Sequence, residues 1–253
     1  IKDGSTSTVI KPKYVLPFQI DDKKAHNIFI DWLHSLWFAP NDLKKYATLN
    51  EKLKGMYMPY WTYDTFATCD YNGERGEYYY TGEGDKRKRE TRWYTINGKI
   101  NHDFDDVCVL ASHSLPDNVT RNLEPWNMKK LSPYNEGFIS GFQTECYQVE
   151  VSNGFETAKT VMNEEIKTQI RREIGGDEQR IHRMHVAYNS VTFKHILLPI
   201  WLSAYRYNSK VYRFIINGES GKVQGQRPYS VIKIALAVIA VIATIIIIKY
   251  LAG

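Results

Sequence analysis

The sequence has 253 residues, 43 % of them hydrophobic and 24 % charged, which is the composition of a globular chain that can bury a substantial core. A formal net charge of +5 suits an anionic membrane surface and is too small for a dedicated nucleic-acid binder. The three cysteines, Cys69, Cys108 and Cys146, are far apart, which argues against a disulfide scaffold and against a zinc site made of cysteines alone.

The chain begins with a polar stretch followed by a predicted strand and helix. Residues 1–13 are polar, and we expect them to be frayed. Residues 14–20 are predicted to form a strand, after which Asp21 and Asp22 can cap a helix that Pro40 ends. The apolar positions of this helix follow helical spacing and comprise Ala25, Ile28, Phe29, Leu33 and Trp37.

A second helix and a β-rich segment are predicted next. The helix covers residues 41–53, and Gly55 is expected to close it. Residues 56–71 are rich in Tyr, Trp, Phe and Thr, the composition of a strand. Asn72-Gly73 and Asn97-Gly98 are both typical of hairpin turns, so we expect an antiparallel meander from about residue 56 to residue 110.

The second half of the sequence predicts a further helix among strands. Residues 112–135 contain three prolines and indicate an irregular connection, and residues 140–151 indicate a strand. Asn153 can open a helix with Glu156 as the partner of its cap, and Gly175-Gly176 ends it. Its apolar stripe comprises Phe155, Ala158, Met162, Ile166, Ile170 and Ile174. Further strands are predicted over residues 179–193, 195–207 and 211–216, with turns at 208–209 and 217–218.

Two segments hint at an internal repeat. The hexapeptide at residues 56–61 resembles the one at residues 196–201, and each follows a predicted strand-then-helix segment. We expect an α+β fold of antiparallel meander sheets with a few helices, possessing two related strand–helix–hairpin units over residues 14–110 and 136–226. The alternative is coincidence in a chain rich in Tyr and Trp. The corresponding division is a frayed segment at 1–13, α+β units at 14–135 and 136–228, and a transmembrane helix at 231–251.

The C-terminal segment has the length and composition of a membrane span. Residues 234–248, from Ile234 to Ile248, are apolar without interruption, and the stretch from Val231 to Leu251 is long enough to cross about 30 Å of hydrocarbon. Lys233 and Lys249 are placed where they can reach the headgroups. A soluble core helix or strand is the alternative, but such a helix seldom lacks a polar face over four turns.

The charges beside this segment predict its orientation. The basic residues that precede it within about twenty-five positions are Lys210, Arg213, Lys222, Arg227 and Lys233. Only Lys249 follows it closely, so the positive-inside rule places the preceding domain in the cytoplasm, as a single-pass protein of the cytoplasmic membrane. The link at residues 224–230 is short and contains Pro228, which predicts a domain held close to the bilayer.

Few residue patterns suggest catalysis. The segment at 218–223 lacks the spacing of a phosphate-binding loop, and His182 and His185 would face opposite sides of a strand. His102 lies near Asp105 and Asp106, which could provide acid–base chemistry, although aspartates are also common at the ends of hairpins. We therefore predict a protein that is not an enzyme and has no cofactor bound to this chain, and an unrecognised enzyme using these residues remains an alternative.

Two neighbouring segments are candidate contact sites. Basic residues at Lys86, Arg87, Lys88, Arg89 and Arg92 could contact anionic lipid or a partner, at about 1 kcal/mol per residue near a membrane surface. Tyr78, Tyr79 and Tyr80 could dock a partner, because at least one of three successive strand residues faces outward. The alternatives are a solvated loop, aromatics covered by other parts of the chain, or a nucleic-acid or replication accessory role at the membrane.

A set of ordered motifs spanning residues 14–250 resembles a known family. They are Leu16-Pro17-Phe18, Trp37-Phe38-Ala39-Pro40, Gly55 to Asp64, Leu123 to Trp126, Pro133-Tyr134, Gly141-Phe142, Phe193 to Trp201, Asn217-Gly218, Gly221 to Val223 and Arg227 to Ser230. Together they resemble bacterial zinc-ribbon membrane proteins that are often labelled as primosomal protein N′ or superfamily II helicase-like. This chain has no nucleotide-binding motif, and it lacks the paired Cys-x-x-Cys knuckles of the ribbon.

The resemblance implies a noncatalytic membrane anchor or scaffold. Members of that family are associated with SPFH-domain (flotillin-like) proteins and with phage-shock-type membrane-stress systems. It therefore implies a hetero-oligomer with an SPFH-domain or related membrane protein, beside the lipid bilayer and without nucleic acid. Zinc is implied only for an N-terminal ribbon that we expect to be missing from this sequence. The resemblance supplies no active-site residues.

Overall fold

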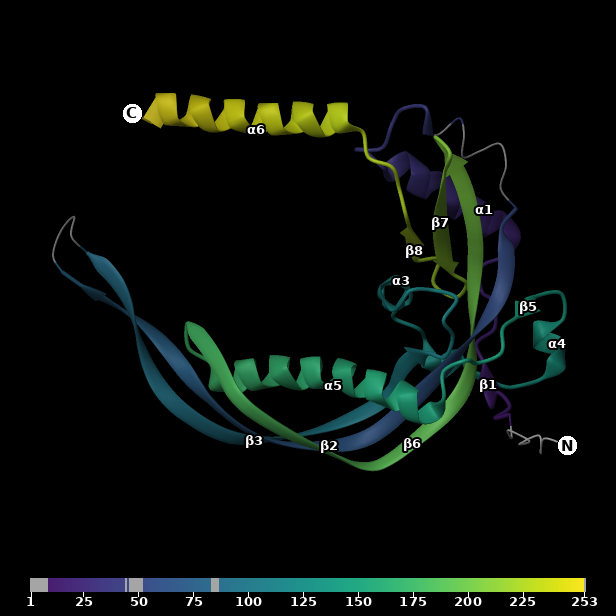
Figure 1. Ribbon diagram of the computed structural model, residues 1–253, viewed down its shortest axis with the longest axis horizontal. Helices are drawn as coiled ribbons and strands as arrows, with labels where there is room; N and C mark the ends of the chain where they lie inside the picture. The colour runs from purple at the N-terminus through teal and green to yellow at the C-terminus, as the bar shows by residue number, and fades with distance from the viewer. Residues whose placement is uncertain (1–8, 44, 46–51, 83–86, 253) are drawn as a thin grey trace, which may run out of the picture. The chain divides into compact units, whose positions relative to one another are not determined.

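The computed structural model describes residues 9–43, 45, 52–82 and 87–252 (Figure 1). The fold is mixed α+β, as predicted, with one eight-stranded sheet among the described residues and an apolar C-terminal helix. The strands are β1 (Tyr14–Val15), β2 (Lys54–Thr81), β3 (Lys88–Leu110), β4 (Ser132–Pro133), β5 (Gln143–Thr144), β6 (Glu178–Tyr207), β7 (Lys210–Asn217) and β8 (Val223–Gly225). The helices are α1 (Asp22–Ser35), α3 (Asp117–Arg121), the 3₁₀ helix η2 (Met128–Lys130), α4 (Glu136–Ile139), α5 (Val151–Ile174) and α6 (Val231–Ala252).

The chain forms two compact units, each built from three separate stretches. The ribbon unit consists of Ile1–Tyr14, Pro59–His113 and Cys146–Ile196, and the anchor unit of Val15–Met58, Ser114–Glu145 and Leu197–Gly253. The sequence predicted two consecutive units divided at residue 135. Consecutive division is wrong because β2 and β6 each contribute residues to both units.

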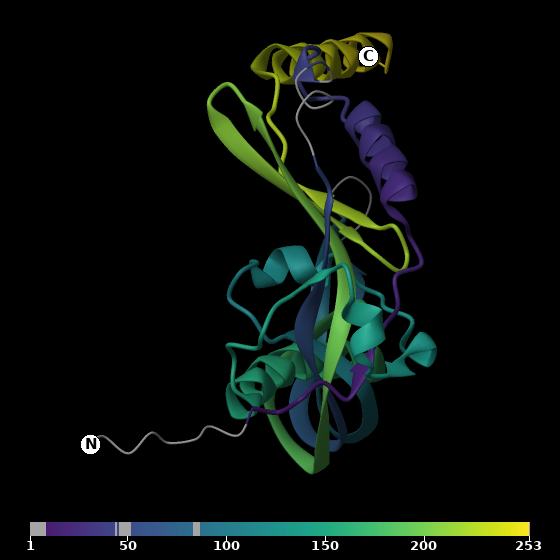
Figure 2. The ribbon, with the colours of Figure 1, turned by 90° about the vertical axis from the view of Figure 1, so that its right-hand side faces the viewer.

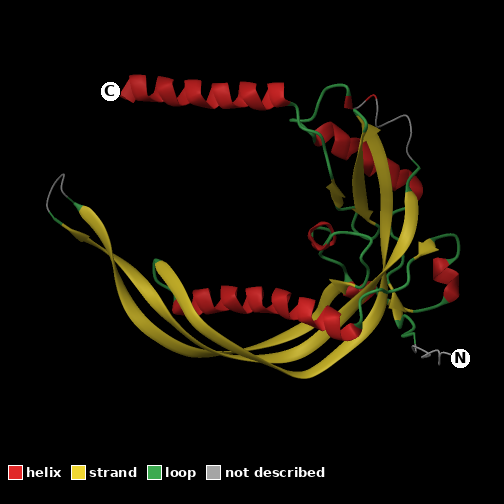
Figure 3. Ribbon diagram, viewed as in Figure 1, coloured by secondary structure: helices red, strands yellow, loops and turns green. Residues whose placement is uncertain are grey.

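The ribbon unit is organised around a very long antiparallel hairpin. β2 and β3 pair from Tyr60 opposite Leu110 to Thr81 opposite Lys88, and β6 lies on the other side of β2. Helix α5 lies along this curved three-stranded sheet (Figures 1 and 3). Its predicted stripe is confirmed, with five buried side chains at Ala158, Met162, Ile166, Ile170 and Ile174. They form one core with sheet residues that include Cys69, Tyr71, Ile100 and Phe104.

The two predicted Asn-Gly turns are wrong. Asn72 lies opposite Asn97 in the middle of the β2–β3 pair, where its side-chain amide donates to the Asn97 Oδ1 at 2.7 Å. A glycine is needed at position 73 for another reason, since a Cβ there would lie 2.3 Å from the Arg180 carbonyl oxygen of β6. The chain instead reverses between Thr81 and Lys88.

The anchor unit contains the predicted first helix. The Asp21 side chain accepts from Lys24 N at 2.7 Å and caps α1, as expected. Ala25, Phe29 and Leu33 are buried, and the Phe29 ring stacks on Phe214 of β7 with centroids 4.0 Å apart. Trp37 does not belong to this stripe, because α1 ends at Ser35. The predicted helix at 41–53 falls largely outside the described residues, and Gly55 lies in β2 rather than at a helix end.

Several predicted boundaries in the middle of the chain also differ. The strands expected at 14–20 and 140–151 are reduced to the two-residue strands β1 and β5. Helix α5 begins at Val151, with Glu150 before it and no side-chain cap, so Asn153 and Glu156 lie inside the helix. The irregular connection contains α3 and η2. The turn at 208–209 is confirmed by positive φ angles of 46° and 64°.

An internal repeat underlies both units. Trp61 of β2 donates its indole N–H to the Val149 carbonyl at 2.7 Å, and Trp201 of β6 donates its own to the Ile20 carbonyl at 2.9 Å. Each acceptor lies two residues before a helix, α5 in the ribbon unit and α1 in the anchor unit. The two tryptophans are the last residues of the hexapeptides whose similarity suggested the repeat.

The backbone around each tryptophan is also bonded alike. Ala111 N donates to the Pro59 carbonyl at 2.9 Å, and Gly218 N donates to the Pro199 carbonyl at 2.8 Å. The Ala111 and Gly218 carbonyls in turn each accept from two successive amides, those of Gln148 and Val149 in one unit and of Gln19 and Ile20 in the other. These amides bond outside a strand ladder, which explains why the predicted strands are so short.

The repeats therefore run along the chain, whereas the compact units exchange their parts. Within the ribbon unit, the β2–β3 hairpin of the first repeat packs on α5 of the second. Within the anchor unit, the β6–β7 hairpin of the second repeat packs on α1 of the first. Because each helix covers the other repeat's hairpin, neither repeat can bury its core alone.

Candidate functional site

Helix α6 has the length and composition of a membrane span. Val231–Leu251 comprises 21 residues, and none of the apolar stretch is buried against the rest of the chain. Its isoleucine and valine side chains are exposed on every face. A soluble core helix would bury this surface, so the exposed span is compatible with insertion into a bilayer.

The start of α6 is bonded to the loop that follows α1. Ser230 N donates to the Phe38 carbonyl at 2.7 Å. The Lys233 ammonium donates to the carbonyl oxygens of Trp37 at 3.1 Å and Ala39 at 2.7 Å. Lys233 was predicted to reach lipid headgroups, but its charge is used within the protein. The chain passes from β8 into α6 through a short link, which Figure 2 shows from the side.

The second candidate is the far end of the β2–β3 hairpin, where the tyrosine run meets the basic run. We call Tyr78, Tyr79, Tyr80, Arg87, Arg89 and Arg92 the Arg–Tyr tip. Three guanidinium groups lie over three rings, with carbon-to-centroid distances of 4.2 Å for Arg89 on Tyr78, 4.9 Å for Arg92 on Tyr79 and 5.1 Å for Arg87 on Tyr80. Each such pair contributes about 0.5–1 kcal/mol at an exposed site.

The strand register explains why these pairs form. Tyr80 lies opposite Arg89 in the ladder, so both side chains leave the same face of the hairpin, and Tyr79 leaves the other face. Lys88 begins β3, and Lys86 lies outside the described residues. Tyr80 is the most accessible of the three tyrosines, with 60 % of its surface exposed. The tip therefore presents both charge and aromatic surface.

Carboxylates hold the tyrosine hydroxyls at the base of the tip. The Tyr78 hydroxyl donates to Glu178 at 2.9 Å and the Tyr79 hydroxyl donates to Glu90 at 2.8 Å. These hydrogen bonds to carboxylates raise the pKa of both phenols, which keeps them neutral. The Tyr78 amide also donates to Asp177, just before β6 begins. Beyond this point the hairpin continues as two strands (Figure 3).

The acidic residues proposed as catalytic form a charge-balanced cluster. Oxygens of Asp64, Asp105 and Asp106 lie within 4.8 Å of one another. The Lys194 ammonium, which sequence reasoning missed, lies 3.1 Å from Asp64 Oδ2 and 2.7 Å from Asp106 Oδ1. The neighbouring charge of Asp106 raises the pKa of Asp105. The cluster coincides with an irregularity in the β2–β3 register beside Asp64, where Asp106 has a φ of 52°.

The histidines do not join this cluster. His102 Nε2 lies 3.5 Å from Glu165 of α5, and its ring packs against Phe104. His182 lies 3.2 Å from Glu74, and His185 is three residues further along the same strand, as predicted. The structure thus separates His102 from Asp105 and Asp106 functionally, because each side has its own partner.

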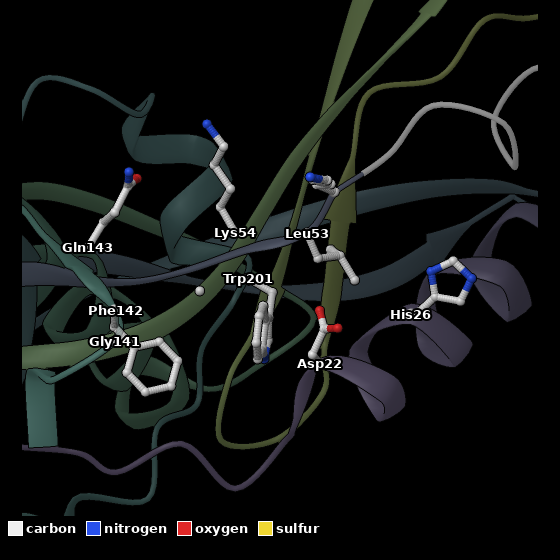
Figure 4. A pocket seen from close by; sticks show the side chains of 10 residues that line it. Asp22, His26, Leu53, Lys54, Gly141, Phe142, Gln143 and Trp201 are labelled. Atoms are coloured by element: carbon white, nitrogen blue, oxygen red, sulfur yellow. The ribbon is translucent and has the colours of Figure 1, made fainter.

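A shallow pocket of about 770 Å³ lies in the anchor unit (Figure 4). Asp22 and His26 point into it from α1, while Trp201 and Phe142 form its apolar wall. Lys54 and Gln143 add polar groups. These side chains are chemically mixed and include no nucleophile beside a base, so the pocket does not indicate a particular reaction.

Comparison with known proteins gives a distant similarity without an activity. The chain is 26 % identical over 227 residues to an uncharacterized protein of Bacillus subtilis (strain 168), YdjG. The match covers 89 % of this chain and 66 % of that protein, so the chain spans slightly less than two thirds of its relative's length. No protein-family model and no solved structure matches the chain.

Proposed function

We propose that this protein is a noncatalytic, membrane-anchored interaction module that assembles with a partner at the cytoplasmic membrane. The observation that carries the proposal is the bonding of the apolar helix α6 to the folded domain through Ser230 and Lys233. Such bonding couples the domain firmly to its anchor, whereas a long flexible tether would let it swing.

The Arg–Tyr tip is the proposed partner contact. Arginine and tyrosine are enriched at the centres of protein interfaces because they offer large, rigid contact area with few rotatable bonds lost. The resemblance to zinc-ribbon membrane proteins points to an SPFH-domain or membrane-stress protein as the partner class. A nucleic-acid role is less well supported, since each tyrosine ring of the tip already carries a guanidinium on one face.

Isolation of the native complex tests this proposal. The full-length chain is extracted from its own membranes in mild detergent, and its copurifying subunits are identified by mass. A triple variant, Arg87→Gln, Arg89→Gln and Arg92→Gln, is expected to lose at least tenfold of the partner. The matched control removes three exposed charges elsewhere in the ribbon unit, at Lys99, Arg172 and Arg183, and should retain it.

A partner-free monomer from native membranes would contradict the proposal, and so would equal recovery of partner with the tip variant. The orientation has its own test. Protease added to intact cells should leave the domain uncut, and digestion only after the membrane is opened would place it in the cytoplasm. Digestion in intact cells would reverse the orientation inferred from the flanking charges.

A further inference from the structure

We propose that the loop Leu36–Pro40 is a second membrane contact, which inserts Trp37 and Phe38 into the headgroup region beside the first turn of α6. This inference rests on the proposed anchoring of the chain by α6, and it adds a lipid-binding surface that lies some two hundred residues earlier in the sequence. We call residues 36–40 the interface loop.

The side chains of the interface loop alternate between buried and exposed. Leu36 and Ala39 are buried in the core of the anchor unit and hold the loop in place. Trp37 is 81 % exposed and Phe38 is 39 % exposed. In the part of the chain that the structure describes, these are large apolar surfaces held out toward solvent on a fixed backbone, which a soluble protein would rarely keep.

Hydrogen bonds fix this loop at the depth where α6 enters the membrane. The Trp37 and Ala39 carbonyls accept from Lys233, and the Phe38 carbonyl accepts from Ser230 N, immediately before the helix. Lys233 is the third residue of α6. Groups bonded directly to the first turn of a membrane span must lie near the boundary between hydrocarbon and water, because the span occupies the whole hydrocarbon thickness.

The chemistry of the loop suits that boundary. Tryptophan and other aromatic side chains are enriched at headgroup depth, where an apolar ring and a polar edge are both satisfied. Tyr229 is also exposed beside the start of α6, and the Arg227 guanidinium lies 5.2 Å from its ring centroid. Tyr250 is 86 % exposed near the other end of the span. Continuity with α6 therefore favours lipid over a protein as the occupant of this surface.

Fluorescence quenching by brominated lipids tests the inference. The full-length chain is reconstituted into vesicles of phosphatidylcholine and phosphatidylglycerol, with or without bromine at a shallow acyl position. The chain has six tryptophans, so Trp37→Phe is compared with the wild type to isolate one emission. Trp93→Phe, in the ribbon unit, is the matched control. We expect Trp37→Phe to lose most of the bromine-dependent quenching and Trp93→Phe to lose none.

Three results would overturn the inference. Equal quenching in Trp37→Phe and wild type, with α6 still resistant to alkaline extraction, would refute the loop contact and leave the anchor intact. Release of the chain by alkaline extraction would refute the anchoring itself. Shielding of Trp37 from aqueous acrylamide without quenching by brominated lipid would show that protein covers the loop.

Discussion

The two hairpins of the internal repeat share one frame but serve different ends. Both begin at a tryptophan that bonds to the chain just before a helix, in the ribbon unit through Trp61 and in the anchor unit through Trp201. The β6–β7 hairpin closes after eight residue pairs and leads through β8 to α6. The β2–β3 hairpin is far longer and ends in the Arg–Tyr tip. Duplication thus supplied two stable bases, and length and terminal chemistry distinguish a contact arm from a membrane mount.

The largest expected effect is at the two tryptophans. Truncation by Trp61→Ala or Trp201→Ala should each cost about 3–5 kcal/mol in free energy of unfolding, because it leaves a cavity and an unpaired buried carbonyl. Hydrogen exchange should show α5 opening first in Trp61→Ala and α1 opening first in Trp201→Ala. Identical exchange patterns in the two variants would contradict the repeat as two equivalent bases.

A smaller effect is expected where the hairpin passes over β6. Gly73→Ala should destabilise the protein by about 1–3 kcal/mol, since the new Cβ meets the backbone of Arg180. Asn72→Thr is the matched control, because a strand tolerates threonine whereas a tight turn with positive φ does not. Denaturant unfolding measures both. Severe loss in Asn72→Thr with none in Gly73→Ala would restore the turn that the sequence suggested.

Lys194→Met sharpens the same comparison through pH, because this charge cluster belongs to the long hairpin. Burial would raise the pKa of Asp64, but hydrogen bonds from the Asp106 amide and from Lys194, with the ammonium charge, hold it below its ordinary 3.8. A lowered pKa contributes stability that is present above the unfolded value and is lost as pH falls through the folded value. Lys194→Met should cost about 1–2 kcal/mol at neutral pH and flatten the decline in stability below pH 4.

The pKa of Lys194 carries the opposite sign. Burial would lower it, but hydrogen bonds and charge from Asp106 and Asp64 raise it overall above 10.5. Its stabilisation is therefore present below that pH and is lost as pH rises through the folded value. Thermal unfolding across the pH range measures both limbs. An unchanged acid limb in Lys194→Met would show that the acidic cluster does not depend on this ammonium.

The smallest effect is expected within the Arg–Tyr tip. Arg89→Lys keeps the charge but loses the planar group stacked on Tyr78, so stability should fall by about 0.5 kcal/mol or less. Partner binding should fall by more than stability if the guanidinium shape is recognised. Equal loss for Arg89→Lys and Arg89→Gln would assign recognition to planarity, and full retention in Arg89→Lys would assign it to charge.

Local patterns predicted the elements that depend on local chemistry. The Asp21 cap, the Ala158-to-Ile174 stripe and the apolar run of α6 each follow from spacing along a few turns. The failures depend on contacts distant in sequence. Gly73 was interpreted as a turn because its neighbour is Asn72, whereas Arg180 requires it. Lys194 could not be paired with Asp64 and Asp106 before the fold brought them together, and Trp37 was assigned to a helix that ends before it.

The most direct test of the account places a photocrosslinker at the exposed Tyr80 of the full-length chain in living cells, with a matched crosslinker at the exposed Thr95 of the same hairpin. Position 80 should yield one major crosslinked species in the membrane fraction, identified by mass as an SPFH-domain or membrane-stress protein, and position 95 should yield little. No crosslinked species at position 80, or the same species in equal amount from position 95, would contradict a membrane-anchored module that binds its partner through the Arg–Tyr tip.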